Sequence, residues 1–142
     1  MPIAIKRAYE TPTPDDGFRV LVDRLWPRGI KKDDAQIDLW VRDLSPSDNL
    51  RKWFHAHTTQ WLTFRRRYLA ELAQESASES LEQLHEVVRS KRMVTLVYSA
   101  RDPVRNNAVV LKQLLDGARK PPSSTGPVKE GATAARRARA RR

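Results

Sequence analysis

The sequence predicts an α/β domain with a small, mainly parallel sheet flanked by helices, followed by a disordered, basic C-terminal tail. Short apolar, β-branched runs stand near the start of the chain and again at residues 93–98. Segments with helical periodicity separate these runs, and this order favours parallel pairing with helices packed on the sheet. The periodicity ends after Gly117. We therefore divide the chain into one domain, residues 1–117, and a tail, residues 118–142.

The first third of the domain predicts three strands. Residues 3–9 alternate in part between apolar and polar side chains, which indicates a first strand. Two prolines and an Asp-Gly pair make residues 10–17 a loop. Residues 18–25 are mostly apolar and suit a strand that is buried on both faces. The Trp-Pro-Arg-Gly stretch ends this strand, residues 30–36 are polar, and residues 37–41 predict a short edge strand.

Helices are predicted in the middle of the chain. Ser47 is a suitable N-cap for a helix over residues 48–57, and a second helix starts near Thr58 or Thr59. The Ser-Ala-Ser-Glu stretch from Ser76 fits a capping box for a third helix. Residues 93–98 then form the best strand in the chain. The final helix begins at an asparagine cap, Asn106 or Asn107, and Gly117 is its predicted end.

Composition bounds the class of protein. The 142 residues include no cysteine, which excludes disulfides, thiolate nucleophiles and cysteine-ligated zinc. The apolar run at the N-terminus is interrupted by Lys6 and Arg7 and is too short for a signal peptide or a membrane span. We therefore expect a cytoplasmic protein that does not bind membranes.

The net charge of +10 is concentrated in the predicted tail. The domain holds 19 basic and 16 acidic residues and is nearly balanced, so the high isoelectric point says little about a site in the folded part. The tail combines one acidic residue, Glu130, with eight basic ones: Arg119, Lys120, Lys129, Arg136, Arg137, Arg139, Arg141 and Arg142. Its composition of proline, serine, alanine and arginine predicts disorder.

The candidate site lies where the predicted strands end, because ligands of open α/β sheets bind beyond the carboxyl ends of the strands. Arginines beside a helix N-terminus suit a phosphate or a carboxylate, aromatic rings could stack on a planar group, and a carboxylate could act as general base. The catalytic candidates are Asp23 and Asp102, and the ligand-binding candidates are Arg7, Tyr9, Arg24, Trp26, Arg28, Tyr98, Arg101 and Asn107.

Each of these residues also has a structural interpretation. Asp23 and Arg24 could form an ion pair or bond to loop amides. Trp26 could be a core or rim aromatic, and Tyr98 ends a buried strand where its hydroxyl needs a partner. Asp102 could form a turn with Asn106 or Asn107. The sequence leaves these alternatives open.

Neither a metal nor a cofactor is predicted. His55 and His57 are two residues apart, which on a helix places them on different faces. The chain has no Walker A loop and no G-x-G-x-x-G motif, and its five glycines are too few for a glycine-lined cradle. The run of three arginines at residues 65–67 indicates a solvated helix face.

The chain resembles the YeaO-like branch of the domain-of-unknown-function family 488 over residues 3–115. The Asp-Arg-Leu-Trp-Pro-Arg-Gly stretch at residues 23–29 is the most specific part of the resemblance. The resemblance implies a small cytoplasmic α/β protein and supplies no reaction. The other motifs that carry it are Ile3-x-x-Lys6-Arg7-x-Tyr9, Asp16-Gly17-x-Arg19, Asp38-x-Trp40, Pro46-Ser47, Leu50-Arg-x-Trp-Phe54, Arg67-Tyr68-x-x-Glu71-Leu72, Thr95-Leu-x-Tyr98-x-Ala100-x-Asp102 and Asn106-Asn107-Ala-x-Val-Leu111.

Two functions are compatible with these features. The domain could bind or process a small anionic or nucleotide-like ligand at the carboxyl edge of the sheet. Alternatively, the protein could associate with nucleic acid through its basic tail, residues 118–142, in a sequence-independent and salt-dependent way. The two functions use different parts of the chain and do not exclude each other.

Overall fold

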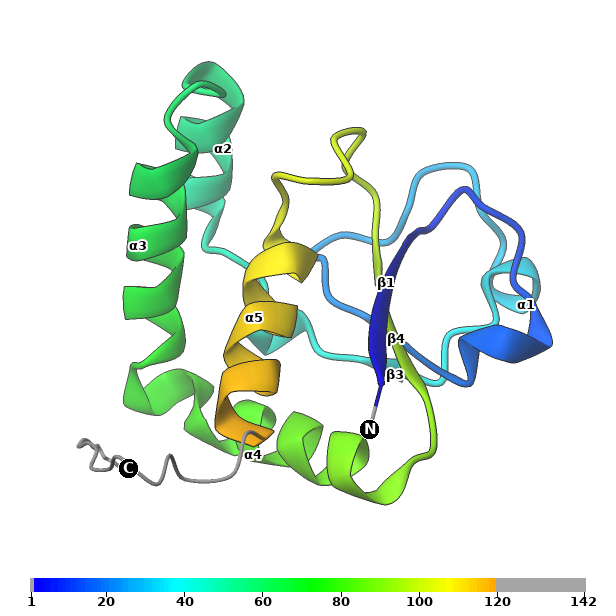
Figure 1. Cartoon of the computed structure of the whole chain (residues 1–142). Helices are drawn as coiled ribbons and strands as arrows, with labels where there is room; N and C mark the ends of the chain where they lie inside the picture. Colours follow the sequence, from blue (N-terminus) through cyan, green and yellow to red (C-terminus); the bar gives the residue numbers. More distant parts are fainter. Residues whose placement is uncertain (1, 120–142) are drawn as a thin grey trace.

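The computed structural model describes residues 2–119, and it confirms the predicted α/β class. A four-stranded sheet has the order β1-β4-β2-β3, and every neighbouring pair of strands is parallel. The predicted tail from residue 120 onward lies outside the described residues. Because all four strands run the same way, their carboxyl ends share one edge of the sheet (Figure 1).

The strands lie close to their predicted positions but two are shorter. Their bounds are β1 Ile3–Arg7, β2 Phe18–Leu21, β3 Leu39–Trp40 and β4 Val94–Tyr98. The strand predicted over residues 18–25 is shorter in the structure and ends at Leu21. The amide of Val22 makes the last hydrogen bond to β4, at Val97 O, and the chain then leaves the sheet. The edge strand predicted over residues 37–41 keeps two residues, paired with Val20 and Leu21.

Helices cover the two faces of the sheet unequally (Figure 1). Helices α2, α3, α4 and α5 gather on one face, where α5 packs directly on β1 and β4 and α3 packs on α5. Helix α1 lies on the other face. The helices are α1 Lys32–Ala35, α2 Asp48–Ala56, α3 Trp61–Leu72, α4 Glu75–Ser90 and α5 Asn107–Arg119, with 3-10 turns η1 Pro14–Asp16 and η2 Arg42–Leu44.

The structure differs from the sequence prediction at three helices: one was missed and two have a different boundary. The polar stretch over residues 30–36 contains α1, a one-turn helix that ends at Gln36 in the left-handed region (φ 51°). The capping box at Ser76 does not form, because α4 already begins at Glu75 with Gln74 as N-cap. Helix α5 continues through Gly117 to Arg119, since the glycine sits in an open position that a helix tolerates.

Two predicted helix starts are confirmed by side-chain bonds. The hydroxyl of Ser47 accepts the amide of Leu50 (3.2 Å) and donates to Glu71 Oε2 (2.6 Å), so the same side chain caps α2 and ties it to α3. An N-cap of this kind contributes about 1 kcal/mol. At the start of α5, Asn106 is the cap, because its Oδ1 accepts the amide of Val109 (3.0 Å).

The sheet separates two apolar clusters, as the alternation of side chains along its strands requires. The larger cluster joins Val20, Leu96 and Tyr98 to the long helices, and it includes Tyr68, whose hydroxyl donates to Leu44 O. The smaller cluster lies on the α1 face and consists of Ala8, Leu21 and Val97 with Trp26, Ile30, Ile37 and Trp40 packed against it. The loops that carry the candidate site therefore stand on a sheet anchored on both faces. Among residues 2–119, no helix has the length and apolar character needed to cross a bilayer.

Candidate functional site

Asp23 joins the ends of three elements at the carboxyl edge of the sheet. Its Oδ2 accepts the main-chain amide of Ser99 (2.8 Å), just beyond β4. Its Oδ1 accepts Nδ2 of Asn107 (3.0 Å), the first residue of α5, and the same Nδ2 donates to Val22 O (3.0 Å). The sequence placed these residues at strand ends, and the structure brings them into hydrogen-bond contact.

Burial dominates the electrostatics of this carboxyl group. Removal from water raises the pKa of Asp23 above its ordinary value of 3.8, and the hydrogen bonds from Asn107 and Ser99 and the charge of Arg51 only partly oppose this rise. A half-buried carboxylate whose oxygens each still have a lone pair can accept a further hydrogen bond from a ligand hydroxyl or amine.

Two polar atoms beside Asp23 are buried and have no hydrogen-bond partner among the described residues. They are Nε of Arg51, on α2, and the hydroxyl oxygen of Ser99. Arg51 keeps one partner through its Nη2, which donates to Asp48 Oδ1 (3.2 Å), and Arg24 Nε lies 3.3 Å from the same carboxylate oxygen. One carboxylate thus holds two arginines at this edge. We name Asp23, Arg51, Ser99 and Asn107 the Asp23 cluster.

Arg7, Tyr9 and Arg28 meet at the end of β1. Nε of Arg7 donates to Ser99 O (3.2 Å) and Ala100 O (3.0 Å), and its guanidinium carbon lies 4.7 Å from the centre of the Tyr9 ring. The Tyr9 hydroxyl donates to the main-chain oxygen of Arg28 (2.9 Å). The Arg28 side chain itself is exposed. Ser99 therefore bonds to this group through its carbonyl and to Asp23 through its amide.

Asp102 is occupied within its own loop. Its Oδ1 accepts the amides of Val104 (2.9 Å) and Arg105 (3.1 Å), and its Oδ2 pairs with Arg105 Nε (3.0 Å). The bond from Val104 is the main cause that lowers the pKa of Asp102 below 3.8. Asp102 lies in a turn, as the sequence allowed, but its carboxylate bonds to Val104 and Arg105, and Asn106 bonds only to its main-chain oxygen (2.8 Å). The neighbouring Arg101 is exposed.

Two of the three aromatic candidates, Trp26 and Tyr98, pack within the fold. Trp26 donates its indole N–H to Ile30 O (2.6 Å) and packs edge-on against Trp40 at a centroid distance of 5.5 Å. Tyr98 is 3 % exposed and belongs to the larger apolar cluster; burial raises its pKa above 10.0. Of the candidate aromatics, only Tyr9 is exposed, with 46 % of its surface accessible, and the Arg7 guanidinium group lies over its ring.

The carboxyl edge thus carries two groups that share Ser99, rather than a ring of converging arginines. Arg24 pairs with Asp48 and not with Asp23, so the intrachain ion pair that the sequence offered as an alternative does not form. Sequence reasoning missed Arg51 and Ser99. Ser99 directly follows β4, and the rule that ligands bind beyond the carboxyl ends of parallel strands (the strand-end rule) selects this position. Arg51 reaches the same edge from α2, and the rule does not select residues on helices.

Two hollows in the described part of the chain lie beside α1. The larger, of about 570 Å³, opens at the start of β2 between the loop around Pro12 and the segment after α1. The smaller, of about 430 Å³, is bordered by residues that follow β1, and Tyr9 is the one predicted site residue that lines either of them. Within residues 2–119, no group of three or more histidine, aspartate or glutamate side chains is arranged to hold a metal.

The fold and the site define a class of protein: a small parallel α/β domain with a polar cluster at the carboxyl edge of its sheet. The chain belongs to the family of unknown function DUF488: the family description that matches, over residues 2–128, reads "Inactive DUF488-N3 subclade". The resemblance that the Asp-Arg-Leu-Trp-Pro-Arg-Gly stretch indicated is confirmed.

Curated relatives share most of the domain. The chain is 45 % identical to the uncharacterized protein YeaO of Escherichia coli over 115 residues. The matched stretch covers 81 % of this chain and 97 % of YeaO. It is 42 % identical over 115 residues to the uncharacterized protein Rv3073c of Mycobacterium tuberculosis and to Mb3100c of Mycobacterium bovis, covering 81 % of this chain and 94 % of each relative. No solved structure matches the chain.

Proposed function

We propose that the domain binds a small anionic, nucleotide-like ligand at the carboxyl edge of its sheet. The observation that carries this proposal is the pair of buried atoms without partners beside Asp23, Nε of Arg51 and the hydroxyl of Ser99. A buried polar group without a hydrogen bond is destabilising, and a ligand that supplies the missing partners would offset that cost.

The chemistry of the Asp23 cluster favours a ligand with both a hydroxyl and a phosphate. Arg51 and Arg24 can bond to phosphate oxygens, because a planar guanidinium group matches their geometry. The remaining lone pairs of Asp23 accept a sugar hydroxyl. The N-terminus of α5, thirteen residues long and anchored by Asn107, adds a favourable dipole for an anion.

The same contacts favour binding without turnover. The oxygens of Asp102 are engaged by Val104 and Arg105, so this carboxylate is poorly placed to act as a base. Asp23 is tied to Asn107 and Ser99 on its two oxygens. The description of the matching subclade as inactive agrees with a binding role. Of the two roles that the sequence left open, we therefore propose binding.

Calorimetric titration of the full chain with AMP, ADP and inorganic phosphate tests the proposal. Removing the Ser99 hydroxyl by Ser99→Ala, or the Arg51 Nε–H by Arg51→Lys, should weaken AMP binding about tenfold, the loss expected for one hydrogen bond to a charged group. Ser99→Ala should leave the free energy of unfolding unchanged or raised, because it removes a buried hydroxyl that has no partner.

The matched control is Ser76→Ala, an exposed serine on α4, which should change neither affinity nor stability. A wild-type chain that binds none of the three probes would refute the proposal. So would equal AMP affinity in wild type, Ser99→Ala and Arg51→Lys, since binding would then occur elsewhere on the protein.

We propose as a second function that residues 118–142 associate with nucleic acid. The supporting observation is their charge, eight basic residues against one acidic residue. Such binding is electrostatic, and its affinity falls with a slope of about −0.9 in log K per log salt for each duplex phosphate neutralised. Replacing the five C-terminal arginines by glutamine in the full chain should reduce this slope by several units: Arg136, Arg137, Arg139, Arg141 and Arg142.

The control variant neutralises another basic run, on α3, by replacing Arg65, Arg66 and Arg67 with glutamine. Fluorescence anisotropy with a labelled DNA duplex, measured at several salt concentrations, distinguishes the two variants. If both variants reduce the slope by the same amount per charge removed, or if neither does, the C-terminal segment has no special role and this second function is wrong.

A further inference from the structure

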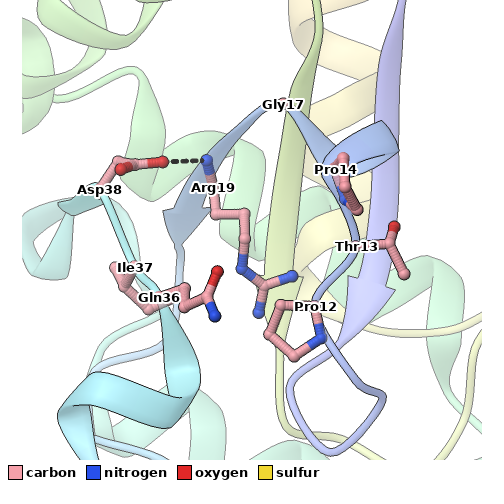
Figure 2. Close-up of a pocket in the computed structure, with 8 residues that line it drawn as sticks. All are labelled: Pro12, Thr13, Pro14, Gly17, Arg19, Gln36, Ile37 and Asp38. Atoms are coloured by element: carbon pink, nitrogen blue, oxygen red, sulfur yellow. Dashed lines mark hydrogen bonds between the residues drawn. The ribbon is translucent and has the colours of Figure 1, made fainter.

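The larger hollow lies away from the Asp23 cluster, at the opposite end of β2. Its wall is formed by Arg19 on β2, by the loop before that strand and by the segment that follows α1. Figure 2 shows the guanidinium group of Arg19 with the Gln36 side chain on one side and Pro12 on the other. A volume of about 570 Å³ is in the range of natural small-molecule sites.

Arg19 is held rigidly but is not fully satisfied. Only 3 % of its side chain is exposed, although arginine is seldom buried to this extent. Its Nη1 donates to Asp16 (2.6 Å) and its Nε donates to the main-chain oxygen of Ala35 (3.1 Å). Arg19 lines the hollow, and its Nη2 is buried and has no hydrogen-bond partner among residues 2–119. Two N–H groups of a fixed cation are thus left for an acceptor.

The charges around the hollow disfavour a ligand with two negative charges. Lys6 and Arg19 share the carboxylate of Asp16, at 3.0 Å and 2.6 Å, so this buried group has one excess positive charge. Asp38 also lines the hollow, and its Oδ2 accepts the main-chain amide of Arg19 (2.9 Å, Figure 2). Asp38 brings the four groups to no net charge, so a phosphate dianion would be repelled more strongly than a monoanion whose charge lies against Arg19.

The remaining walls combine one further donor with apolar surface. Gln36 adopts a left-handed backbone conformation, which a non-glycine residue takes up only when its surroundings hold it there. Its side-chain amide faces the same space as the Arg19 guanidinium group (Figure 2). Pro12, Pro14 and Ile37 supply apolar contacts. A cation, an amide donor and apolar walls match a carboxylate head attached to a small carbon body.

We propose that this hollow is a second binding site, specific for small organic monocarboxylates. The carboxylate accepts hydrogen bonds from Nη2 of Arg19 and from the Gln36 amide, and the carbon body lies against the two prolines and Ile37. The site shares no residue with the Asp23 cluster and does not depend on the ligand proposed there. It supplies an acceptor for Nη2 of Arg19 and leaves the ion pairs of Asp16 in place.

Nuclear magnetic resonance of the full chain tests the site with benzoate as the probe. The side-chain Nε–Hε resonance of Arg19, which is protected by its bond to Ala35 O, reports directly on this guanidinium group. Benzoate should shift it saturably, while benzyl alcohol and inorganic phosphate at the same concentrations should not. Because the readout is a single residue, binding of anions to basic residues elsewhere in the chain does not obscure it.

Two variants separate the proposed contacts. Gln36→Ala should weaken benzoate binding about tenfold, as loss of a hydrogen bond to a charged group does. Asp38→Asn keeps an oxygen for the Arg19 amide but removes the opposing charge, so it should tighten benzoate binding at low salt and allow phosphate to bind. Gln83→Ala, an exposed glutamine on α4, is the control and should behave like the wild type.

Three results would overturn this proposal. An Arg19 resonance that does not respond to benzoate would show that no carboxylate binds beside this guanidinium group. An equal shift with benzyl alcohol shows that the hollow does not select a carboxylate. A normal response to benzoate that Gln36→Ala and Asp38→Asn leave unchanged places the binding outside this hollow. None of these outcomes affects AMP binding at the Asp23 cluster, so the two sites are tested independently.

Discussion

Replacing Asp16 by asparagine should lower the free energy of unfolding by about 3–5 kcal/mol, the cost of removing one partner from a buried ion pair. Asp16 is 7 % exposed and pairs with both Lys6 and Arg19. It also accepts the amide and the hydroxyl of Thr13, at 3.1 Å each. The asparagine side chain keeps the shape and one acceptor but leaves Arg19 buried with an uncompensated charge.

The pH dependence of this effect has a definite sign. Burial alone would raise the pKa of Asp16, but hydrogen bonds from Thr13, Lys6 and Arg19 together hold the pKa below 3.8. A carboxyl group with a lowered pKa in the folded chain contributes its full stability above the unfolded value and loses it as the pH falls through the folded value. The difference in stability between wild type and Asp16→Asn should therefore be constant above about pH 5 and shrink below about pH 4.

Urea denaturation of the full chain at several pH values measures both effects. Asp15→Asn is the matched control, because Asp15 belongs to the same turn, is exposed and makes no ion pair among the described residues. It should change stability by less than about 0.5 kcal/mol. A loss below about 1 kcal/mol for Asp16→Asn, or a loss that persists unchanged at low pH, would contradict the buried charge network.

Replacing Gly17 by alanine should cost about 2–4 kcal/mol, from backbone strain and a steric clash together. Gly17 has a φ of 66°, and a Cβ there would lie 2.4 Å from the main-chain oxygen of Met93. That oxygen accepts the amide of Phe18 (2.9 Å), the bond that begins the pairing of β2 with β4. Relief of the clash would therefore displace the first bond of the central strand pair.

Gly29→Ala provides the comparison for this prediction. Gly29 also has a positive φ, 82°, but a Cβ there meets no atom within 4 Å. This variant should lose roughly 1 kcal/mol, the cost of the backbone conformation alone. Thermal and urea unfolding of the two variants separate strain from close approach. Equal losses would show that the contact with Met93 has no energetic weight.

Much of the fold followed from local sequence patterns. Residues 93–98 predict β4 because a short β-branched run can be buried on both faces, and Ser47 predicts the start of α2 because its hydroxyl can replace a missing main-chain acceptor. Helix α1 was missed because its four residues have no apolar periodicity. It is fixed by tertiary contacts, in which Ala35 O accepts Arg19 Nε and Ala35 itself is buried.

The candidate site was predictable in its position and less so in its composition. The strand-end rule selected Asp23 and Asn107, which the structure joins, because parallel strands bring their carboxyl ends together. It could not select Arg51, which comes from a helix separated from β2 along the chain. Arg19 was also missed, although a charged residue within an apolar strand is a signal, since its burial requires a counter-charge such as Asp16.

The position of β4 has a consequence for synthesis of the protein. This strand is the last of the four to be synthesised, yet it lies between β1 and β2 in the sheet and pairs with both of them. Until residues 94–98 are made, the edges of β1 and β2 that pair with β4 have no partner. Only the two-residue pairing of β2 with β3 is available earlier. A nascent chain therefore exposes two strand edges for most of its translation, and folding waits for nearly the whole domain. We therefore expect chains released before residue 98 to be recognised by chaperones and proteases as unfolded.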